Sequence, residues 1–245
     1  MSAHTSSAEK DAGKPIAFVS AQALRERMHD AVNDPHLRSS FRGAMDFLMA
    51  KRAAQFPDES ELASLRTLSE GIRQYSLARL PDLLEQLEAN LTRNGVQVHW
   101  AETPDEANAI MLGIARRHEA KLIVKGKSMV SEEIEFNHAM EAAGVGALES
   151  DMGEYIVQLA GEKPSHIIMP AIHKTKEQIA RLFADKVPGV DYTDNVDALI
   201  RIGRDVLREK FEEAEIGLSG VNFAVAETGT LCLVENEGNG RMCTT

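Results

Sequence analysis

A glycine, a lysine and a serine follow the apolar stretch "KLIVK" and precede a helix-like segment. These residues, Gly126, Lys127 and Ser128, match the end of a P-loop, in which backbone N–H groups and a lysine hold phosphates. A P-loop also needs a glycine five positions before its Gly-Lys pair, and position 121 is a lysine. The P-loop interpretation therefore fails. What remains is a strand-to-helix turn that offers a positive charge and a hydroxyl group to a carboxylate or a phosphate.

Polar side chains also follow three other apolar runs, "VGAL", "SHIIM" and "NFAVA". They are Glu149, Ser150, Asp151, His173, Lys174, Glu227 and Thr228, and Gly229 follows the last of them. In open parallel sheets, ligands bind outside the carboxyl ends of the strands. We therefore expect the four turns to line one polar crevice, with lysines and a histidine that hold an anion and carboxylates that balance or polarise it.

Some of these carboxylates also have a purely structural explanation. Glu132 and Glu133 lie in a first helical turn, where the helix dipole favours acids, so we expect them to be structural. Asp151 and Glu154 can be a helix cap and a first-turn acid in the same way. Together with Glu149, however, they place three carboxylates within six positions of one strand-to-helix turn, which also fits a functional role.

The histidines give one candidate for acid–base chemistry. His138 follows Glu135 by three positions, but di-iron helix bundles need a second Glu-x-x-His copy, which the sequence lacks. His166 lies inside an apolar run and is expected to be a core residue. His173 lies just past the same run, where an acid, a base or an anion donor is useful.

Composition excludes several classes of protein. The 245 residues include 27 Lys and Arg against 38 Asp and Glu, and the resulting charge of −11 would repel nucleic acid. No apolar run is long enough to span a membrane, and the polar N-terminus lacks the apolar core of a signal peptide. Cys232 and Cys243 are half of what one iron–sulfur cluster takes, so we expect a cytoplasmic chain with no metal ligands of its own.

The patterning predicts three segments: a disordered tail over residues 1–19, a helical region over 20–94, and an α/β domain over 95–245. The helical region has an apolar stripe made of Leu62, Leu65, Leu68, Ile72 and Tyr75. Within it, Pro81 is expected to begin a new helix.

From residue 95 onward, short apolar runs alternate with amphipathic helices. Strands are expected over residues 96–100, 121–125, 145–148 and 165–169, and helices over 103–119, 131–143, 152–160, 174–186 and 195–215. The last segment, around "ETGT", predicts a hairpin with Gly229 in its turn. This pattern predicts an α/β fold with a mixed, mostly parallel sheet and flanking helices.

Four stretches resemble the lactate utilisation protein B family, the iron–sulfur subunit of a bacterial L-lactate oxidising system. They are "VKGKSMVSEEIEFN", "LESDMGEYIVQLAGEKPSHIIMPAIHK", "GVNFAVAETGTLCLVENEGNGR" and "MCTT", and the likeness extends from about residue 20 to the end. The resemblance implies a LUD domain, whose fold is like that of sugar-phosphate isomerases, coenzyme A transferases and 5-formyltetrahydrofolate cyclo-ligases.

The resemblance also implies a cofactor and partners. Full-length members of the family are expected to hold two [4Fe–4S] clusters for electron transport, on cysteines beyond the point that matches Thr245. The chain is thus expected to be truncated, to ligate no cluster, and to be inactive alone as part of a multi-subunit, NAD-independent L-lactate dehydrogenase. Its partners would be the other subunits of that system and a small anionic ligand.

The expected ligand-binding residues are Lys127, Ser128, Glu149, Asp151, His173, Lys174, Thr228, Gly229, Asn236 and Asn239. Two alternatives stay open. By analogy with the fold relatives, the domain could transfer acyl groups or coenzyme A, with Glu227 or Glu237 as carboxylate nucleophile. It could instead be a non-catalytic docking module that uses the helical N-terminal region.

Overall fold

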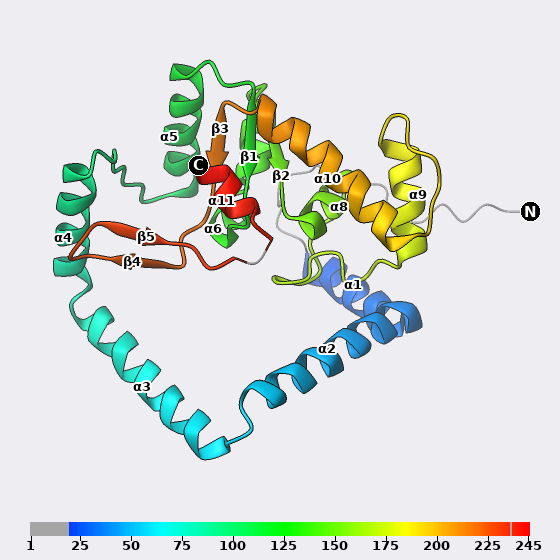
Figure 1. Ribbon diagram of the computed structural model, residues 1–245, viewed down its shortest axis with the longest axis horizontal. Helices are drawn as coiled ribbons and strands as arrows, with labels where there is room; N and C mark the ends of the chain where they lie inside the picture. The colour runs from blue at the N-terminus through cyan, green and yellow to red at the C-terminus, as the bar shows by residue number, and fades with distance from the viewer. Residues whose placement is uncertain (1–19, 236) are drawn as a thin grey trace, which may run out of the picture. The chain divides into compact units, whose positions relative to one another are not determined.

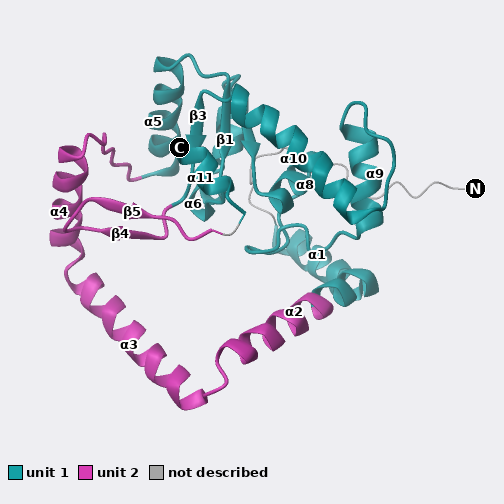
Figure 2. Ribbon diagram, viewed as in Figure 1, with its two compact units in different colours: residues 1–41, 103–220, 237–245 teal, residues 42–102, 221–236 magenta. Residues whose placement is uncertain are grey.

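The computed structural model describes residues 20–235 and 237–245, which form two compact units (Figures 1 and 2). Unit 1 contains the described residues of segments 20–41, 103–220 and 237–245, and unit 2 those of 42–102 and 221–235. The tail predicted over residues 1–19 and the candidate residue Asn236 lie outside the described residues.

A three-stranded parallel sheet forms the centre of unit 1. Strand β1 (Leu122–Lys125) lies between β2 (Gly146–Glu149) and β3 (Ile216–Leu218). In the register of this sheet, Lys125 pairs with Glu149 on one side and with Leu218 on the other, so the carboxyl ends of all three strands lie together. We did not predict β3, because three residues are too short to establish an alternating pattern.

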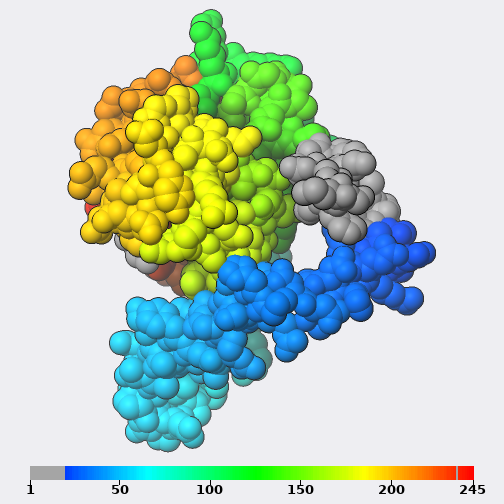
Figure 3. All heavy atoms as spheres, turned by 90° about the vertical axis from the view of Figure 1, so that its right-hand side faces the viewer, coloured from blue at the N-terminus to red at the C-terminus, as the bar shows by residue number. Residues whose placement is uncertain are grey.

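Helices cover both faces of this sheet, because successive strand side chains point to opposite faces. Ile123 and Ala147 pack in one core with helices α5 (Pro104–Arg117) and α7 (Phe136–Ala142). Leu148 packs in a second core with helices α8 (Met152–Ala160), α9 (Lys176–Lys186) and α10 (Val196–Glu213). Helices α9 and α10 lie against each other in both views (Figures 1 and 3). The predicted α/β class with flanking helices is confirmed.

Two predicted strands are wrong. Residues 96–100 form no strand and pair with no other segment, and Trp100 is 57% exposed. Residues 165–168 form bends instead, because the ring Nδ1 of His166 accepts the backbone N–H groups of Ile168 and Met169, each at 3.2 Å. His166 is therefore a half-buried residue that closes a local turn and not a residue of a core strand.

One predicted helix is interrupted. The segment expected to be helical over residues 131–143 divides into α6 (Met129–Glu133) and α7. Glu135, between them, has φ of 55°, a left-handed conformation that a continuous right-handed helix does not allow. Glu132 ends up on the short helix that directly follows the β1 turn, where it can reach the sheet.

The N-terminal region is helical, as predicted. Helix α1 (Ala21–Asn33) belongs to unit 1, α2 (Pro35–Gln55) extends from it into unit 2, and α3 (Glu59–Ala78) and α4 (Leu80–Arg93) belong to unit 2. Pro81 lies in the first turn of α4, as predicted. None of the described residues of α1, α2 or α3 is buried. The boundary expected at residue 95 stays a prediction.

The predicted hairpin is confirmed and packs within unit 2. Strands β4 (Phe223–Val225) and β5 (Thr230–Cys232) pair with each other and form a separate two-stranded antiparallel sheet. Gly229 lies in the turn with φ of 68°, and a Cβ there would lie 2.7 Å from the backbone carbon of Asn90 on α4. Only glycine fits both the turn conformation and this close approach.

Helix α11 (Asn239–Thr244) packs against β3 and β1. Gly217 makes this possible, because a Cβ at that position would lie 1.8 Å from the carbonyl oxygen of Cys243. Gly126, just after β1, similarly faces the backbone of Gly240 at 3.3 Å from its would-be Cβ. The last described residues therefore lie beside the carboxyl end of the sheet.

Replacement of Gly229 by Ala should destabilise the hairpin turn and its contact with α4. The left-handed conformation costs about 1–2 kcal/mol for an L-residue and the overlap with Asn90 adds about 1–3 kcal/mol. Gly95→Ala is the matched control, since Gly95 also has positive φ, 86°, but open space around it. Urea denaturation should show a larger loss of unfolding free energy for Gly229→Ala, and equal losses would contradict the close approach.

Candidate functional site

The carboxyl ends of the strands are held together by backbone and hydroxyl groups. The carbonyl oxygen of Lys125 accepts hydrogen bonds from the backbone N–H of Ser150 at 2.9 Å and from its hydroxyl at 2.8 Å. The backbone N–H of Gly126 donates to the carbonyl oxygen of Leu218 at 2.7 Å. The polar turns that follow β1 and β2 therefore start from one fixed edge.

A buried lysine with two carboxylate partners lies at this edge. The Nζ of Lys125 donates to Glu149 Oε1 at 2.5 Å and to Glu132 Oε1 at 2.6 Å, and only 1% of the lysine side chain is exposed. Asn137 donates to the same Glu149 oxygen at 2.7 Å. We call Lys125, Glu132, Asn137 and Glu149 the buried network.

The ionisation of the buried network reflects a competition between burial and charge. Burial alone would lower the pKa of Lys125, but the charges of Glu149 and Glu132 outweigh it and raise that pKa above the ordinary value. Burial raises the pKa of Glu149 despite the attraction of Lys125. The lysine is thus a fixed cation, already occupied by its partners and closed to solvent.

The second lysine of this edge is accessible. The Nζ of Lys127 lies 3.1 Å from Asp151 Oδ2 and 3.3 Å from the carbonyl oxygen of Ile168, and 32% of its side chain is exposed. Asp151 also caps helix α8, because its Oδ1 accepts the backbone N–H groups of Gly153 and Glu154 at 3.0 and 3.1 Å. Lys127 is therefore a cation with one acidic partner and a face open to a ligand.

Glu154 is a buried acid at the same edge. It is the third residue of α8 and only 6% exposed, and its Oε2 has no hydrogen-bond partner within the described part of the chain. Burial, followed by the negative charges of Glu149 and Asp151, raises its pKa to about 8, against the opposing pull of Lys127 and Lys125. At neutral pH this carboxyl is therefore mostly protonated and can donate a hydrogen bond.

Ser128 has a structural role in the described fold. Its hydroxyl oxygen accepts the backbone N–H of Ser131 at 3.2 Å and so caps α6, the helix on which Glu132 lies. The serine thereby helps to place a partner of Lys125. Its role in contacting a ligand stays a prediction.

His173 and Lys174 form a cluster around Glu162. His173 Nε2 and Lys174 Nζ each lie 2.7 Å from Glu162 oxygens, and His173 Nδ1 lies 2.7 Å from the hydroxyl of Ser165. Burial acts to raise the pKa of Glu162, but the hydrogen bonds from Lys174 and His173 outweigh it and hold that pKa below its ordinary value. Both candidate residues thus already have an acidic partner.

Three candidates lie in the hairpin of unit 2. The backbone oxygens of Glu227 and Thr228 each accept an amide N–H, from Asn90 and Asn94 of α4, at 2.9 Å in both cases. Gly229 provides the turn described above. Asn90 and Asn94 are contacts that the sequence patterns did not indicate, because their partners lie more than a hundred positions away.

Two further candidates lie near the sheet edge in unit 1. Glu237 Oε2 accepts the backbone N–H of Met152, the first residue of α8, at 3.4 Å. Asn239 begins α11, and its side-chain Nδ2 is buried without a hydrogen-bond partner among the residues described. Its Oδ1 accepts the backbone N–H of Gly240 at 2.9 Å.

Sequence reasoning missed the contact between Lys125 and Glu132. The sequence patterns place Lys125 in a strand and Glu132 in a first helical turn that the helix dipole favours for acids, and only the fold brings the two together at 2.6 Å. A lysine as the last residue of an otherwise apolar strand, "LIVK", is the signal that could have indicated a buried charge.

The cysteines do not fit an iron–sulfur cluster. Cys232 lies in β5, and Cys243 lies buried in α11 with its Sγ 3.7 Å from the Ser150 hydroxyl, whereas a cluster ordinarily takes four thiolates. Among the described residues, no group of three His, Cys, Asp or Glu side chains could hold a metal ion. In the same part of the chain, no helix is long and apolar enough to cross a membrane.

Comparison with known proteins assigns the family. The family model for the LUD domain matches residues 84–245, which include the sheet, its edge and the hairpin. The chain belongs to the LUD domain family. The resemblance found in the sequence is therefore confirmed at the level of the domain.

Named relatives of this LUD domain chain are proteins called lactate utilization protein B. The protein from Bacillus pumilus is 43% identical over 227 residues, which cover 92% of this chain and 48% of the relative. The Bacillus cereus (strain AH820) protein is 42% identical over 90% of this chain and 46% of the relative, and the Bacillus licheniformis protein is 41% identical over 93% and 48%. The chain spans about half the length of these relatives. No solved structure matches the chain.

Removal of the buried cation should unfold the sheet edge. Lys125→Met leaves the buried Glu149 without its charge partner, and breaking such a pair costs about 3–5 kcal/mol. Lys127→Met is the matched control, because its partner pair is partly exposed and worth about 1 kcal/mol or less. Urea denaturation of both variants measures the difference, and a small loss for Lys125→Met would contradict a structural role of the buried network.

The stability of the protein should fall as the pH rises, because of Glu154. Its folded pKa of about 8 exceeds the ordinary value of 4.5, so the folded state binds more protons than the unfolded state between these values. This stabilisation is complete below the ordinary value and is lost as the pH rises through about 8. The loss of unfolding free energy between about pH 5.5 and pH 8 is roughly 3 kcal/mol.

Glu154→Gln should lose this part of the pH dependence, because an amide does not titrate. The exposed Glu133→Gln is the control and should retain it. Urea denaturation at both pH values gives the change in unfolding free energy with pH for each variant. Equal changes for the parent and Glu154→Gln would show that Glu154 titrates normally.

Proposed function

We propose that this chain takes part in lactate utilisation, as the LUD-domain portion of an iron–sulfur subunit of the cytoplasmic, multi-subunit system that oxidises L-lactate to pyruvate without NAD. The observation that supports this best is identity of 41–43% over about 90% of the chain to proteins named lactate utilization protein B. Such identity over nearly the whole chain favours a shared role over a shared fold alone.

The domain's own part in this proposal is to bind a small anion at the sheet edge. Lys127 supports this, because it combines a charge, partial exposure and a single acidic partner, Asp151, that a ligand carboxylate can replace. The buried network ties the ends of β1 and β2 to α6 and α7 by hydrogen bonds, and a site fixed before binding needs less ordering by the ligand. His173, Lys174 and Asn239 stay candidates for further contacts.

The electron-transfer chemistry is proposed to lie outside this chain. [4Fe–4S] clusters, when bound by the full-length protein, would supply one-electron transfer. The residues of this chain would then bind and orient the anion. The other subunits of the system are the proposed partners.

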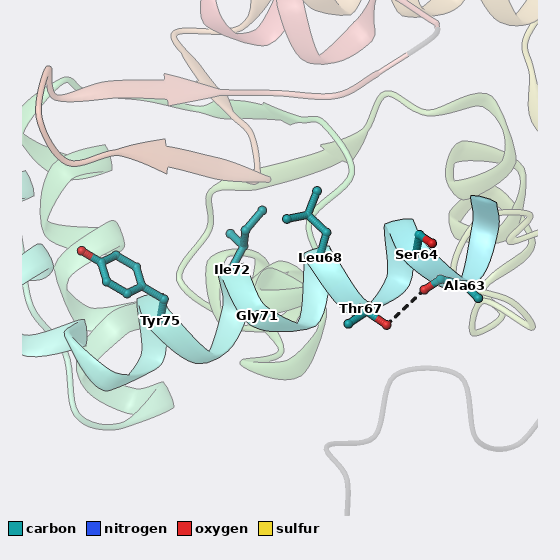
Figure 4. A pocket seen from close by; sticks show the side chains of 7 residues that line it. All are labelled: Ala63, Ser64, Thr67, Leu68, Gly71, Ile72 and Tyr75. Atoms are coloured by element: carbon teal, nitrogen blue, oxygen red, sulfur yellow. Dashed lines mark hydrogen bonds between the residues drawn. The ribbon is translucent and has the colours of Figure 1, made fainter. Parts of the chain in front are cut away.

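A second function, docking of partner subunits, is favoured by the surface of α3. Its apolar stripe is exposed: Leu68, Ile72 and Tyr75 are 61%, 58% and 60% exposed. Leu68 and Ile72 point to the same side of the helix (Figure 4). The neighbouring Thr67 hydroxyl is occupied within the helix, because it donates to the Ala63 carbonyl oxygen at 3.2 Å. An exposed apolar stripe of this kind is typical of helices that pack against another chain. The acyl-transfer alternative, with Glu227 or Glu237, stays a prediction that no described contact favours.

Replacement of Lys127 should impair lactate oxidation by the full-length protein. Loss of a charged hydrogen bond costs about 1.5–3 kcal/mol, so Lys127→Ala should weaken substrate use by about 10- to 100-fold. Lys163→Ala is the matched control, because Lys163 is 76% exposed and its ion pair with Glu135 is long, at 3.8 Å. Lactate-dependent dye reduction measures both. Full activity of Lys127→Ala would remove the central residue of the proposed site.

Replacement of apolar residues in the α3 stripe should prevent docking of the other subunits without affecting ligand binding. Leu68→Ser combined with Ile72→Ser should leave the fold intact, since both side chains are already exposed, but should abolish co-purification of the other subunits. Ser64→Ala and Thr67→Ala on the same helix serve as the control. Unchanged co-purification of the double variant would exclude the stripe as the docking surface.

A further inference from the structure

Four buried polar atoms near the sheet edge have no hydrogen-bond partner among the residues that the structure describes. They are Glu154 Oε2, Glu149 Oε2, Asn137 Oδ1 and Asn239 Nδ2. Glu149 and Glu154 are only 4% and 6% exposed. A buried polar atom without a partner costs free energy, so such groups usually serve a ligand or water.

Glu154 differs from Glu149 in its hydrogen-bond and charge partners. Glu149 already accepts hydrogen bonds from Lys125 and Asn137 through its other oxygen, and so belongs to the buried network. Glu154 has no ion pair of this kind among the described residues. Its backbone N–H donates to Asp151 Oδ1 at 3.1 Å, and the other oxygen of that carboxylate lies 3.1 Å from the Nζ of Lys127, so Glu154 and the accessible lysine share Asp151 as a neighbour.

We propose that protonated Glu154 donates a hydrogen bond to the carboxylate of a small, singly charged carboxylic acid whose other contact is the Lys127 ammonium. This inference rests on the proposed ligand site at Lys127 and deepens it. The ligand carboxylate takes the place of Asp151 at Lys127, and Glu154 satisfies its unpartnered oxygen. Binding is thereby coupled to a proton, because only the neutral form of Glu154 can donate.

The charge of the edge selects the class of ligand. Lys125 and Lys127 face Glu132, Glu149 and Asp151, so the edge is already negative by one charge even with Glu154 neutral. A monocarboxylate adds one charge next to one accessible lysine. A dianion such as sulfate would add a second charge that Lys125 and Lys127, the lysines described at this edge, do not balance, so it should bind much more weakly.

The groups that face Glu154 determine the direction of its pH dependence. Glu149 at the end of β2 and Asp151 before α8 raise its pKa together with burial, and Lys127 after β1 and Lys125 in β1 oppose them. The resulting pKa of Glu154, about 8, leaves the acid mostly protonated at pH 7 and mostly ionised at pH 9. An ionised Glu154 would repel the ligand, so affinity should fall roughly tenfold over this interval.

Isothermal titration calorimetry of the 245-residue chain with L-lactate, pyruvate and sulfate tests the proposal. Each titration is run at pH 7 and pH 9 in two buffers of different ionisation heat, which reports proton uptake. For L-lactate or pyruvate we expect roughly tenfold weaker binding at pH 9 and uptake of close to one proton there. Sulfate should bind much more weakly at both pH values.

Two variants make the test specific. Glu154→Gln keeps a neutral donor, so it should bind at pH 7 like the parent and lose both the pH dependence and the proton uptake. Glu154→Leu removes the donor and should weaken binding at pH 7 at least tenfold. Glu133→Gln, on the exposed side of α6, should behave as the parent. Circular dichroism melts check that each variant is folded, and the parent's own pH dependence needs no variant.

The outcomes separate this inference from the function on which it rests. If neither carboxylate binds the parent at either pH, the ligand site itself is wrong and this inference falls with it. If a carboxylate binds equally at pH 7 and pH 9 without proton uptake, the Lys127 site stands and the role of Glu154 is overturned. If sulfate binds as tightly as L-lactate and pyruvate, the singly charged ligand class is overturned.

Discussion

The ion pair between Lys125 and Glu149 is the interaction on which the rest of this LUD domain depends. Both side chains are almost fully buried at the end of a sheet with strands of only three or four residues. A buried charge is tolerated only when it is paired and hydrogen-bonded, and here Glu132 accepts a further hydrogen bond from Lys125 while Asn137 donates one to Glu149. The network therefore requires α6, α7, β1 and β2 to be placed together before the domain is stable.

This constraint explains why Lys127, two positions after Lys125, is the lysine that is accessible to a ligand. Because Lys125 is buried and paired with two glutamates, Lys127 is the lysine described at this edge whose side chain is partly exposed to solvent. Burial, together with the same crowding of carboxylates, raises the pKa of Glu154, so that this buried acid can be a neutral donor. The ion pairs of the buried network and the neutral state of Glu154 thus both follow from the burial of several charged groups at one edge.

The sequence predicted what depends on local patterns and missed what depends on distant contacts. The amphipathic helices, the strand ending at Lys125 and the hairpin at Gly229 follow from periodicity and turn residues, and the structure confirms them. The strand expected at 165–169 was wrong, because the ring of His166 offers a local turn that competes with strand pairing. The partners Lys125 and Glu132 could not be paired in advance, since no periodic pattern relates a strand end to the helix after it.

A crystal structure of the chain with bound pyruvate, at about pH 7, tests the central claim most directly. The account predicts the pyruvate carboxylate at the Nζ of Lys127, in place of Asp151, with a carboxyl oxygen of Glu154 within hydrogen-bond distance and the buried network unchanged. Pyruvate bound away from Lys127, or Lys127 still paired with Asp151 while the ligand occupies another position, would contradict it.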